Sequence, residues 1–305
     1  MQETVTLGPT DISLKPLGVG AMPWNKKTVQ GAKAAFEASL EAGLTLFDTA
    51  EVYGRGISEK ILGRLVRRTD QTVIVASKFA PLPYRVRTSS LSRALAGSLR
   101  RLGLEQIDLY QIHWPYTALK IEPLMDALAD EVEAGRVRTV GVSNYNEDQM
   151  RRAHAALAER GIPLASNQVQ YSLLHRAPER NGVLQACREL NVSLIAYTPI
   201  GSGILTGKYR DGLPRPGGMR RLSKQFRRLA QLEPLISELE AVADAHERSA
   251  GQVALNWLLR KDGVIPIPGA KDADQARSNA GALDFEITDE EADRLSGISE
   301  EVLGL

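Results

Sequence analysis

A chain of 305 residues, with 43% apolar and 25% charged residues, is large enough to bury a substantial core. Its formal net charge of +1 excludes bulk electrostatic attraction to nucleic acid or anionic lipid as the basis of function. Cys187 is the only cysteine, which excludes an intramolecular disulfide and fits a reducing compartment.

The amino terminus lacks the basic and apolar segments of a signal peptide, and no apolar run is long enough to span a bilayer. We therefore expect a soluble, cytoplasmic protein without a nucleic-acid or membrane partner. We expect a monomer rather than an oligomer.

The first fifteen residues predict a small β-hairpin, because residues 4–7 and 12–14 alternate apolar and polar side chains around a Gly-Pro-Thr-Asp turn. Beyond the hairpin, apolar strand-like runs alternate with helix-patterned segments, mostly at intervals of about 30 residues, the size of one βαβ unit. The strand-like runs are residues 17–19, 44–47, 73–76, 107–112, 139–142, 165–169, 193–196 and 264–267. The helical segments include residues 29–42, 91–102, 124–134, 148–159 and 183–190.

Eight strands that alternate with helices predict parallel pairing, in either a closed barrel or a doubly wound open sheet. A dinucleotide-binding open sheet should carry Gly-x-Gly-x-x-Gly after its first strand, but Pro23 stands where the third glycine would follow Gly18 and Gly20. No linker-like composition divides the chain. We therefore predict an α/β fold with a single (β/α)8 TIM-barrel domain over residues 1–305, preceded by the hairpin in residues 1–15.

One step of this alternation is much longer than the others, from residue 197 to residue 264. It contains a stretch rich in glycine, proline and arginine, residues 201–228, and a helical segment near residues 234–246. Loops of this length in compact domains are usually functional or mobile. We predict a mobile loop at residues 201–232, and extra helices before strand eight and at the carboxyl terminus.

The carboxyl ends of the predicted strands carry polar or aromatic side chains, and the active site of such a barrel lies at those ends. Taken alone, each residue has an ordinary explanation: Asp48 caps a helix, Tyr53 packs in a loop, Lys78 is a solvated charge and His113 is structural. A run of consecutive strand ends of this kind indicates a common site. The strand-end residues are Asp48, Lys78, His113, Ser143, Asn144, Asn167, Gln168 and Tyr197.

Asp48, Tyr53, Lys78 and His113 together suggest acid–base chemistry on a carbonyl group. A phenol has a pKa of about 10, and a lysine ammonium close to its oxygen would stabilise the phenolate and lower that pKa. An aspartate would keep the ammonium charged and oriented, and the histidine could donate a hydrogen bond to a substrate carbonyl oxygen. No metal is expected, because the four histidines are scattered and the single cysteine offers no thiolate cluster.

Several segments resemble the signature motifs of the aldo-keto reductases, and the similarity extends from the hairpin to about Leu283. Residues 47–54 read Phe-Asp-Thr-Ala-Glu-Val-Tyr-Gly, residues 77–78 Ser-Lys, residues 109–115 Leu-Tyr-Gln-Ile-His-Trp-Pro and residues 141–145 Gly-Val-Ser-Asn-Tyr. The resemblance implies an (α/β)8 barrel that uses NADPH to reduce a small-molecule aldehyde or ketone. Asp48, Tyr53, Lys78 and His113 match the family's catalytic tetrad, with Tyr53 as the proton donor.

The same resemblance implies which residues hold NADPH or NADP+. Ser143, Asn144 and Gln168 match residues that hold the nicotinamide carboxamide, and Tyr197 matches the aromatic residue that stacks on the ring. Residues 198–206 resemble the loop that crosses the pyrophosphate, and Lys271 follows strand eight, where it could meet a 2′-phosphate. The expected cofactor-binding residues are Gly20, Ala21, Met22, Asp48, Ser143, Asn144, Gln168, Tyr197, Thr198, Pro199, Ile200, Gly201, Gly203, Leu205, Gly269, Lys271, Gln275 and Asn279.

Substrate selection is expected at the rim of the same site, together with the 201–228 loop. The expected substrate-pocket residues are Trp24, Tyr53, Tyr84, His113 and Trp114, although the aromatic residues among them could equally serve as rim packing.

Residues 201–208, Gly-Ser-Gly-Ile-Leu-Thr-Gly-Lys, resemble a phosphate-binding P-loop in composition only. A P-loop needs four residues between its glycines and Ser or Thr after the lysine, whereas Tyr209 follows Lys208. Nucleoside triphosphate chemistry is therefore not expected.

Three functions remain open at this point. The first is an NADPH-dependent reductase of aldehydes or ketones. The second is a dehydrogenase that works with NAD on a sugar or alcohol, against which Lys271 argues. The third is a non-enzymatic, NADPH-binding redox-sensing subunit, because the potassium-channel β subunits share the implied fold and cofactor. Arg277, in the helix after strand eight, is an alternative to Lys271 as the 2′-phosphate ligand.

Overall fold

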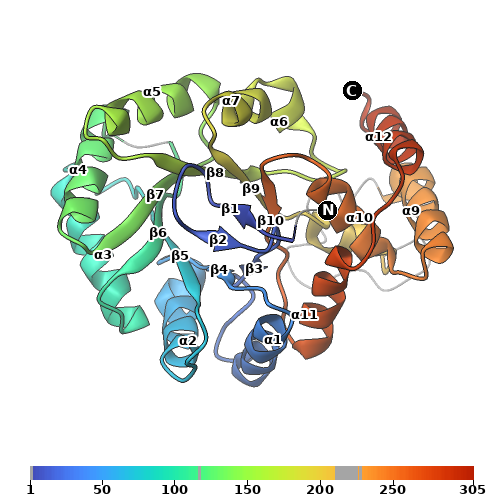
Figure 1. Ribbon diagram of the computed structural model, residues 1–305, viewed down its shortest axis with the longest axis horizontal. Helices are drawn as coiled ribbons and strands as arrows, with labels where there is room; N and C mark the ends of the chain where they lie inside the picture. Colours follow the sequence, from blue (N-terminus) through green and yellow to red (C-terminus); the bar gives the residue numbers. More distant parts are fainter. Residues whose placement is uncertain (1–2, 116–117, 210–225, 227–228) are drawn as a thin grey trace.

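Eight parallel strands lie side by side in chain order, from β3 to β10, and helices surround them (Figure 1). The structure is a computed structural model that describes residues 3–115, 118–209, 226 and 229–305. The prediction of a (β/α)8 barrel is confirmed. Its strands are β3 (Val19–Gly20), β4 (Leu46–Asp48), β5 (Ile74–Phe79), β6 (Ile107–Ile112), β7 (Val137–Ser143), β8 (Leu164–Gln170), β9 (Ser193–Tyr197) and β10 (Val264–Pro266).

The barrel closes at a seam between its first and last strands. The Gly18 N–H donates to the Pro266 carbonyl oxygen at 2.9 Å, and the Gly20 N–H donates to the Pro268 carbonyl oxygen at 3.0 Å. A parallel bridge joins Gly20 to Gly269 just beyond these bonds. Because β3 and β10 have only two and three residues, closure depends on a few backbone hydrogen bonds.

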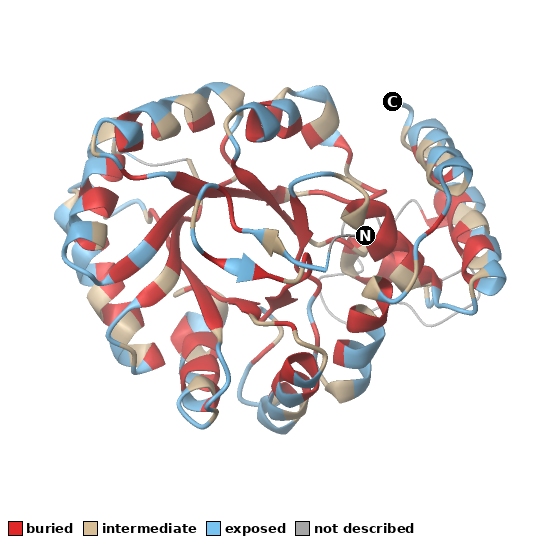
Figure 2. Ribbon diagram, viewed as in Figure 1, coloured by how far each residue is buried: buried red, intermediate tan, exposed pale blue. Residues whose placement is uncertain are grey.

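Helices cover the outside of the barrel, with buried inner faces and exposed outer faces (Figure 2). Where α1 crosses α11, Gly31 lies so close to the Lys271 carbonyl that a Cβ atom would collide with it. The described α-helices are α1 (Val29–Glu41), α2 (Ile57–Val66), α3 (Ser89–Leu102), α4 (Ile121–Glu133), α5 (Glu147–Ala158), α6 (Ala177–Arg180), α7 (Val183–Glu189), α9 (Glu233–Ala245), α10 (Ala250–Leu259), α11 (Ala273–Ala280) and α12 (Asp289–Leu303).

The extra helices that the sequence predicts are confirmed. Helix α9 covers most of residues 234–246, and α12 lies at the carboxyl terminus. Helix α12 begins with a capping box, in which the Thr288 side chain accepts from the Glu291 N–H and the Glu291 side chain accepts from the Thr288 N–H. The short α6 was not predicted, because four residues are too few to show a helical period.

The strands appear in the sequence as continuous apolar runs because both faces of the sheet are buried. Side chains on the outer face, such as Phe47, Val75 and Tyr110, pack against the helices. Side chains on the inner face, such as Leu46 and Ile74, fill the barrel itself. The two sets form separate apolar clusters, one on each side of the sheet.

The N-terminal hairpin closes the amino-terminal end of the barrel. Its strands, β1 (Val5–Thr6) and β2 (Ser13–Leu14), pair antiparallel and cross the barrel opening in Figure 1. Leu7, Ile12 and Leu14 join the inner apolar cluster. The Gly8 N–H donates to the Ser193 hydroxyl at 2.8 Å. The predicted hairpin is thus confirmed, and it leaves the carboxyl end of the barrel accessible.

Most of the predicted mobile loop, residues 210–225 and 227–228, lies outside the described residues. Its described flanks contain two 3-10 turns, η2 (Gly201–Thr206) and η4 (Leu229–Leu232). Across the part of the chain that the structure describes, the helices are too short or too polar to traverse a bilayer.

Candidate active site

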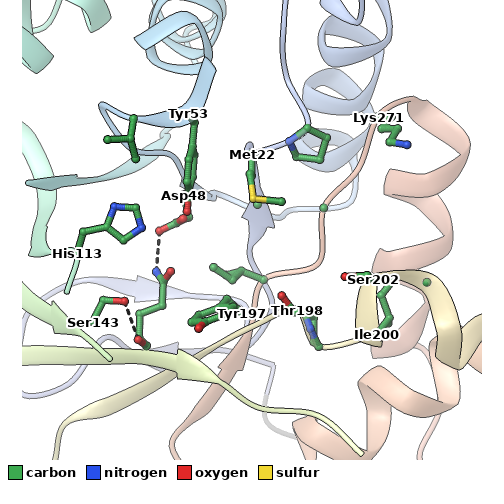
Figure 3. A pocket seen from close by; sticks show the side chains of 18 of the residues that line it. Met22, Asp48, Tyr53, His113, Ser143, Tyr197, Thr198, Ile200, Ser202 and Lys271 are labelled. Atoms are coloured by element: carbon green, nitrogen blue, oxygen red, sulfur yellow. Dashed lines mark hydrogen bonds between the residues drawn. The ribbon is translucent and has the colours of Figure 1, made fainter. Parts of the chain in front are cut away.

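A cavity of about 380 Å³ opens at the carboxyl ends of the strands (Figure 3). Most of the residues that the sequence singles out line this cavity, although they come from different strand ends along the chain. The predicted residues that line it are Gly20, Met22, Asp48, Tyr53, His113, Trp114, Ser143, Asn144, Gln168, Tyr197, Thr198, Pro199, Ile200, Gly203, Gly269, Lys271 and Gln275.

Lys78 and Asp48 form a buried ion pair at one end of the cavity. Lys78 lies on β5 without exposed surface, and Asp48 ends β4 and is 3% exposed. The Lys78 ammonium donates to the Asp48 carboxylate and, at 2.8 Å, to the Thr49 carbonyl oxygen. Burial by itself would lower the pKa of Lys78, but attraction to Asp48 and Tyr53 and the hydrogen bonds to both residues together outweigh it, so the pKa is raised. Lys78 is therefore a fixed cation at neutral pH.

Tyr53 begins a 3-10 turn, η1 (Tyr53–Gly56), and its ring points towards Asp48 in Figure 3. Its phenol oxygen accepts a hydrogen bond from Lys78 Nζ at 3.4 Å. Burial raises the pKa of Tyr53 above 10.0, and Lys78 offsets only part of that effect. The expectation that Lys78 lowers this pKa below that of a free phenol is wrong in its net direction. The phenol consequently stays protonated at neutral pH, as a proton donor requires.

His113 follows β6 and faces Tyr53, with the two ring centres 5.7 Å apart and the rings nearly perpendicular. The His113 ring also stacks on the Trp114 ring, with the ring centres 3.8 Å apart and an interplanar angle of 4°. Burial, with a smaller effect from Lys78, lowers the pKa of His113 to about 3, so the imidazole is neutral. Its buried Nδ1 has no hydrogen-bond partner among the described residues. Because an orphaned N–H is rarer than an orphaned acceptor, we place the proton on Nε2.

Polar side chains from β7, β8 and β9 form a hydrogen-bonded network beside the ion pair. Gln168 Nε2 donates to Asp48 Oδ1 at 2.7 Å, and Ser143 Oγ donates to the Gln168 carbonyl oxygen at 2.8 Å. The Tyr197 hydroxyl donates to Asn144 Oδ1 at 3.0 Å, and Asn144 Nδ2 donates to Ser143 Oγ at 3.1 Å. Since an amide oxygen has two acceptor sites, Asn144 and Gln168 keep acceptor capacity for a ligand.

Three non-glycine residues of the cavity wall have a left-handed backbone: Asn144 (φ 61°), Thr198 (φ 55°) and Ser202 (φ 58°). Such conformations cost of the order of 1–3 kcal/mol each and cluster at ligand-binding sites. Their concentration here supports a binding role for the cavity wall.

The end of the cavity remote from Tyr53 carries positive charge (Figure 3). Lys271 lies just before α11, whose first turn is capped by the Asp272 side chain accepting from the Gln275 N–H at 2.9 Å. The side chain of Lys208 lies over Gly203, where a Cβ atom would collide with it. Two lysines and a helix amino terminus at one end of a cavity suit a ligand with anionic groups.

Four of the expected cofactor-binding residues do not line the cavity. Ala21 and Leu205 have no exposed surface, and Gly201 is also buried. The Asn279 side chain is not part of the lining but donates to the carbonyl oxygen of Gly269, which is, at 3.5 Å.

Two of the expected substrate-pocket residues need correction. Trp24 is fully buried: its indole N–H donates to the Ala270 carbonyl oxygen at 2.8 Å, and its ring lies 6.1 Å from that of Phe47. It supports the barrel seam rather than the cavity. Tyr84 is 75% exposed and lies outside the cavity lining.

Several residues that line the cavity were missed by sequence reasoning. Val52 and Pro23 each adjoin a predicted residue, so proximity in sequence was the available signal. Ser202 and Lys208 were expected only as parts of the 198–206 and 201–228 segments and were not singled out, because loop composition does not show where a side chain points. The lining residues that were not named individually are Pro23, Val52, Ser202, Lys208 and Ile267.

Among the described residues, no group of three or more His, Cys, Asp or Glu side chains is arranged to hold a metal ion.

Comparisons with known proteins agree with the fold. The family model for the aldo/keto reductase family matches residues 16–300. The chain is 37% identical to the chloroplastic pyridoxal reductase of Arabidopsis thaliana, over 95% of this chain and 84% of that protein. It is 32% identical to the L-glyceraldehyde 3-phosphate reductase of Escherichia coli strain K12, over 90% of this chain and 86% of that protein. The crystal structure of an aldo-keto reductase from Klebsiella pneumoniae in complex with NADPH matches with a TM-score of 0.80 and 26% identity, over 98% of this chain and 96% of that one.

Proposed function

Because the chain belongs to the aldo/keto reductase family, we propose that it is an NADPH-dependent reductase of aldehydes or ketones. The observation that carries the proposal is the convergence of three groups at one end of the cavity. They are the protonated phenol of Tyr53, the fixed cation of Lys78 and the neutral imidazole of His113. Such a set can protonate a carbonyl oxygen without a metal ion.

The residues of the cavity fit NADPH. Lys208 and Lys271 would hold its phosphate groups, and the ring of Tyr197 would face the nicotinamide. The spare acceptor capacity of Asn144 and Gln168 matches the N–H donors of a carboxamide. When bound, NADPH supplies the hydride that is added to the carbonyl carbon of the substrate.

Within this proposal, His113 and Tyr53 act on the carbonyl oxygen. His113 donates a hydrogen bond from Nε2, which stabilises the negative charge that develops on that oxygen. Tyr53 transfers its phenolic proton to the same oxygen, so the substrate becomes an alcohol and Tyr53 becomes a phenolate. Lys78, whose Nζ is 3.4 Å from the phenol oxygen, stabilises the phenolate until solvent returns the proton.

The proposal is tested by incubating the purified chain with NADPH and a panel of aldehydes and ketones, following the loss of NADPH absorbance. We expect oxidation that depends on the carbonyl compound. Cofactor binding without such turnover would instead favour a redox-sensing subunit. Faster turnover with NAD and sugars or alcohols would favour a dehydrogenase.

We extend the proposal to uncharged, planar aldehydes. Pyridoxal reductase and L-glyceraldehyde 3-phosphate reductase are named for an aromatic and a phosphorylated substrate. Near Tyr53 the described lining side chains include Met22, Val52 and Trp114. Lys271 lies at the other end of the cavity in Figure 3. We expect kcat/KM for pyridoxal to exceed that for pyridoxal 5′-phosphate by roughly tenfold. None of the described residues that line the Tyr53 end is a cation, and Lys78 behind it is buried and already paired with Asp48. The opposite order in steady-state assays would contradict this extension.

Replacing Lys271 with alanine should weaken NADPH binding much more than NADH binding, because the two cofactors differ only in the 2′-phosphate. One charge-assisted hydrogen bond at an exposed position corresponds to roughly a tenfold loss of affinity, and the loss should shrink at high salt. Titrations of both cofactors, followed by intrinsic fluorescence, measure the effect.

Arg277→Ala is the matched control for Lys271→Ala. The Arg277 side chain is 60% exposed and lies outside the cavity lining. Its Nη2 is 3.7 Å from Oε2 of Glu41. Equal losses for NADPH and NADH in the Lys271 variant, or a selective loss only in the Arg277 variant, would refute the assignment.

A further inference from the structure

The turn that carries Tyr53 has an unusual backbone, held within itself by hydrogen bonds such as that from the Arg55 N–H to the Val52 carbonyl oxygen at 3.1 Å. Gly54, Arg55 and Gly56 follow it with φ values of 57°, 56° and 82°, so three consecutive residues have a left-handed backbone. The hydrogen bond from Lys78 to the phenol oxygen is long, at 3.4 Å. A displacement of the ring by about 1 Å would remove that bond and misplace the proton, so contacts outside the turn must fix its position.

Glu51, two residues before Tyr53, makes such contacts with the loop that follows β5. Its Oε1 accepts from the Ala80 N–H at 2.7 Å and from Arg85 Nη1, and its Oε2 accepts from Arg85 Nη2 at 2.9 Å. Arg85 Nη1 also donates to the Ala80 carbonyl oxygen at 2.7 Å. The guanidinium thus binds both carboxylate oxygens of Glu51 and the carbonyl oxygen of Ala80, the residue whose N–H binds Glu51. A lysine ammonium cannot reproduce this geometry in full.

The loop that contains Ala80 and Arg85 follows directly from β5, the strand that carries Lys78. The Arg85 guanidinium lies 5.0 Å from the centre of the Phe79 ring, and Phe79 directly follows Lys78 on β5. The Phe79 carbonyl oxygen accepts from the His113 N–H at 2.9 Å. The contact between Glu51 and Arg85 therefore fixes the position of the Tyr53 turn relative to β5 and β6, the strands that position Lys78 and His113.

We propose that Glu51 and Arg85 form a clamp that positions the Tyr53 phenol for proton transfer. The clamp rests on the proposed function of Tyr53 as proton donor. Neither residue lines the cavity, so both act through Tyr53 and touch neither substrate nor cofactor. Their side chains are only 9% and 15% exposed, which keeps solvent from competing for the hydrogen bonds.

The clamp is tested by replacing Arg85 with methionine, which keeps an apolar stem over Phe79 but removes every hydrogen bond. We expect kcat for carbonyl reduction to fall by roughly ten- to a hundredfold, the effect of misplacing a reacting group by about 1 Å. The NADPH dissociation constant and KM for NADPH should remain native, because the clamp does not reach the cofactor end. Arg85→Lys should recover part of the lost kcat, since an ammonium can still bind Glu51.

Arg136→Met is the matched control, because Arg136 pairs with the buried Glu131 at 2.5 Å near the amino-terminal end of β7, away from the cavity. It removes a comparable ion pair and should lower the melting temperature without lowering kcat. Equal kcat losses in the two methionine variants would overturn the clamp, since they would reflect stability alone. So would native kcat in Arg85→Met.

Glu51→Gln provides a second variant if Arg85→Met does not fold. The amide keeps the shape of the carboxylate and an acceptor for the Ala80 N–H, but it loses the ion pair. A measurable fall in kcat with native NADPH affinity supports the clamp, and native kcat overturns it. Failure of the proposed function is distinguishable, because the wild-type chain would then lack carbonyl-dependent NADPH oxidation or Tyr53→Phe would keep full activity. Failure of the clamp requires an active wild type and an inactive Tyr53→Phe together with an active Arg85→Met.

Discussion

Replacing Tyr53 with phenylalanine is expected to slow carbonyl reduction by roughly a hundred- to ten-thousandfold, the usual contribution of general acid catalysis. The substitution removes only the phenolic oxygen and its proton. Because burial raises the pKa of Tyr53, the wild-type phenol is protonated at neutral pH, so the loss should be seen across the neutral range. NADPH affinity should hardly change, and single-turnover rates with saturating cofactor measure the chemical step.

Tyr84→Phe is the control for that experiment, since Tyr84 is 75% exposed and outside the cavity. It should retain native turnover. Near-native turnover in Tyr53→Phe would show that the proton comes from another group and would remove the basis of the proposed mechanism.

Replacing Lys78 with methionine should lower the reduction rate by roughly a hundred- to a thousandfold, the range observed when one preorganised electrostatic group is removed. It should also shift the pH dependence. Burial raises the pKa of Tyr53 and Lys78 opposes that rise, so without Lys78 the pKa of Tyr53 moves further up. Under the proposed mechanism, alcohol oxidation with NADP+ needs the phenolate and accelerates as pH passes this pKa, so the ascending limb of its pH profile should move to higher pH. An unchanged limb in an active variant would refute the coupling.

The Lys78 variant also carries a stability cost that must be separated from the kinetic effect. Asp48 is 3% exposed and would lose its cation, and breaking a buried ion pair on one side costs about 3–5 kcal/mol. A double variant, Asp48→Asn with Lys78→Met, removes the uncompensated charge. Its melting temperature should recover while its reduction rate stays low.

The strand-end residues could be predicted from the sequence because parallel strands bring their carboxyl ends to one face of a barrel. Asp48, His113 and Gln168 are far apart along the chain, yet each follows or ends an apolar run, and all three line one cavity. The seam partners of Trp24 could not be predicted. A tryptophan near an expected site suggests a pocket residue, whereas its indole N–H binds the Ala270 carbonyl at the opposite end of the chain.

The direction of the pKa shift at Tyr53 also could not be predicted from the sequence. The neighbouring cation was predicted, but the net shift depends on how completely the ring is desolvated, which only the packed structure shows. The Glu51–Arg85 pair was hidden for a related reason. Both residues lie in loops, where no helical or strand period marks a facing partner, and surface carboxylates and guanidinium groups are too common to pair by inspection.

The seam between β3 and β10 determines the order in which a growing chain can complete this cavity. A nascent chain that has emerged as far as β9 already contains Asp48, Tyr53, Lys78 and His113. The wall formed by Gly20 and Gly269 still lacks one of its halves at that stage, because the last strand has not been made. The proposed reacting groups therefore precede Gly269, Lys271 and Gln275, which complete the cavity wall, during synthesis. A chain that stops early carries the proposed acid–base residues but lacks the lysine proposed to hold the 2′-phosphate.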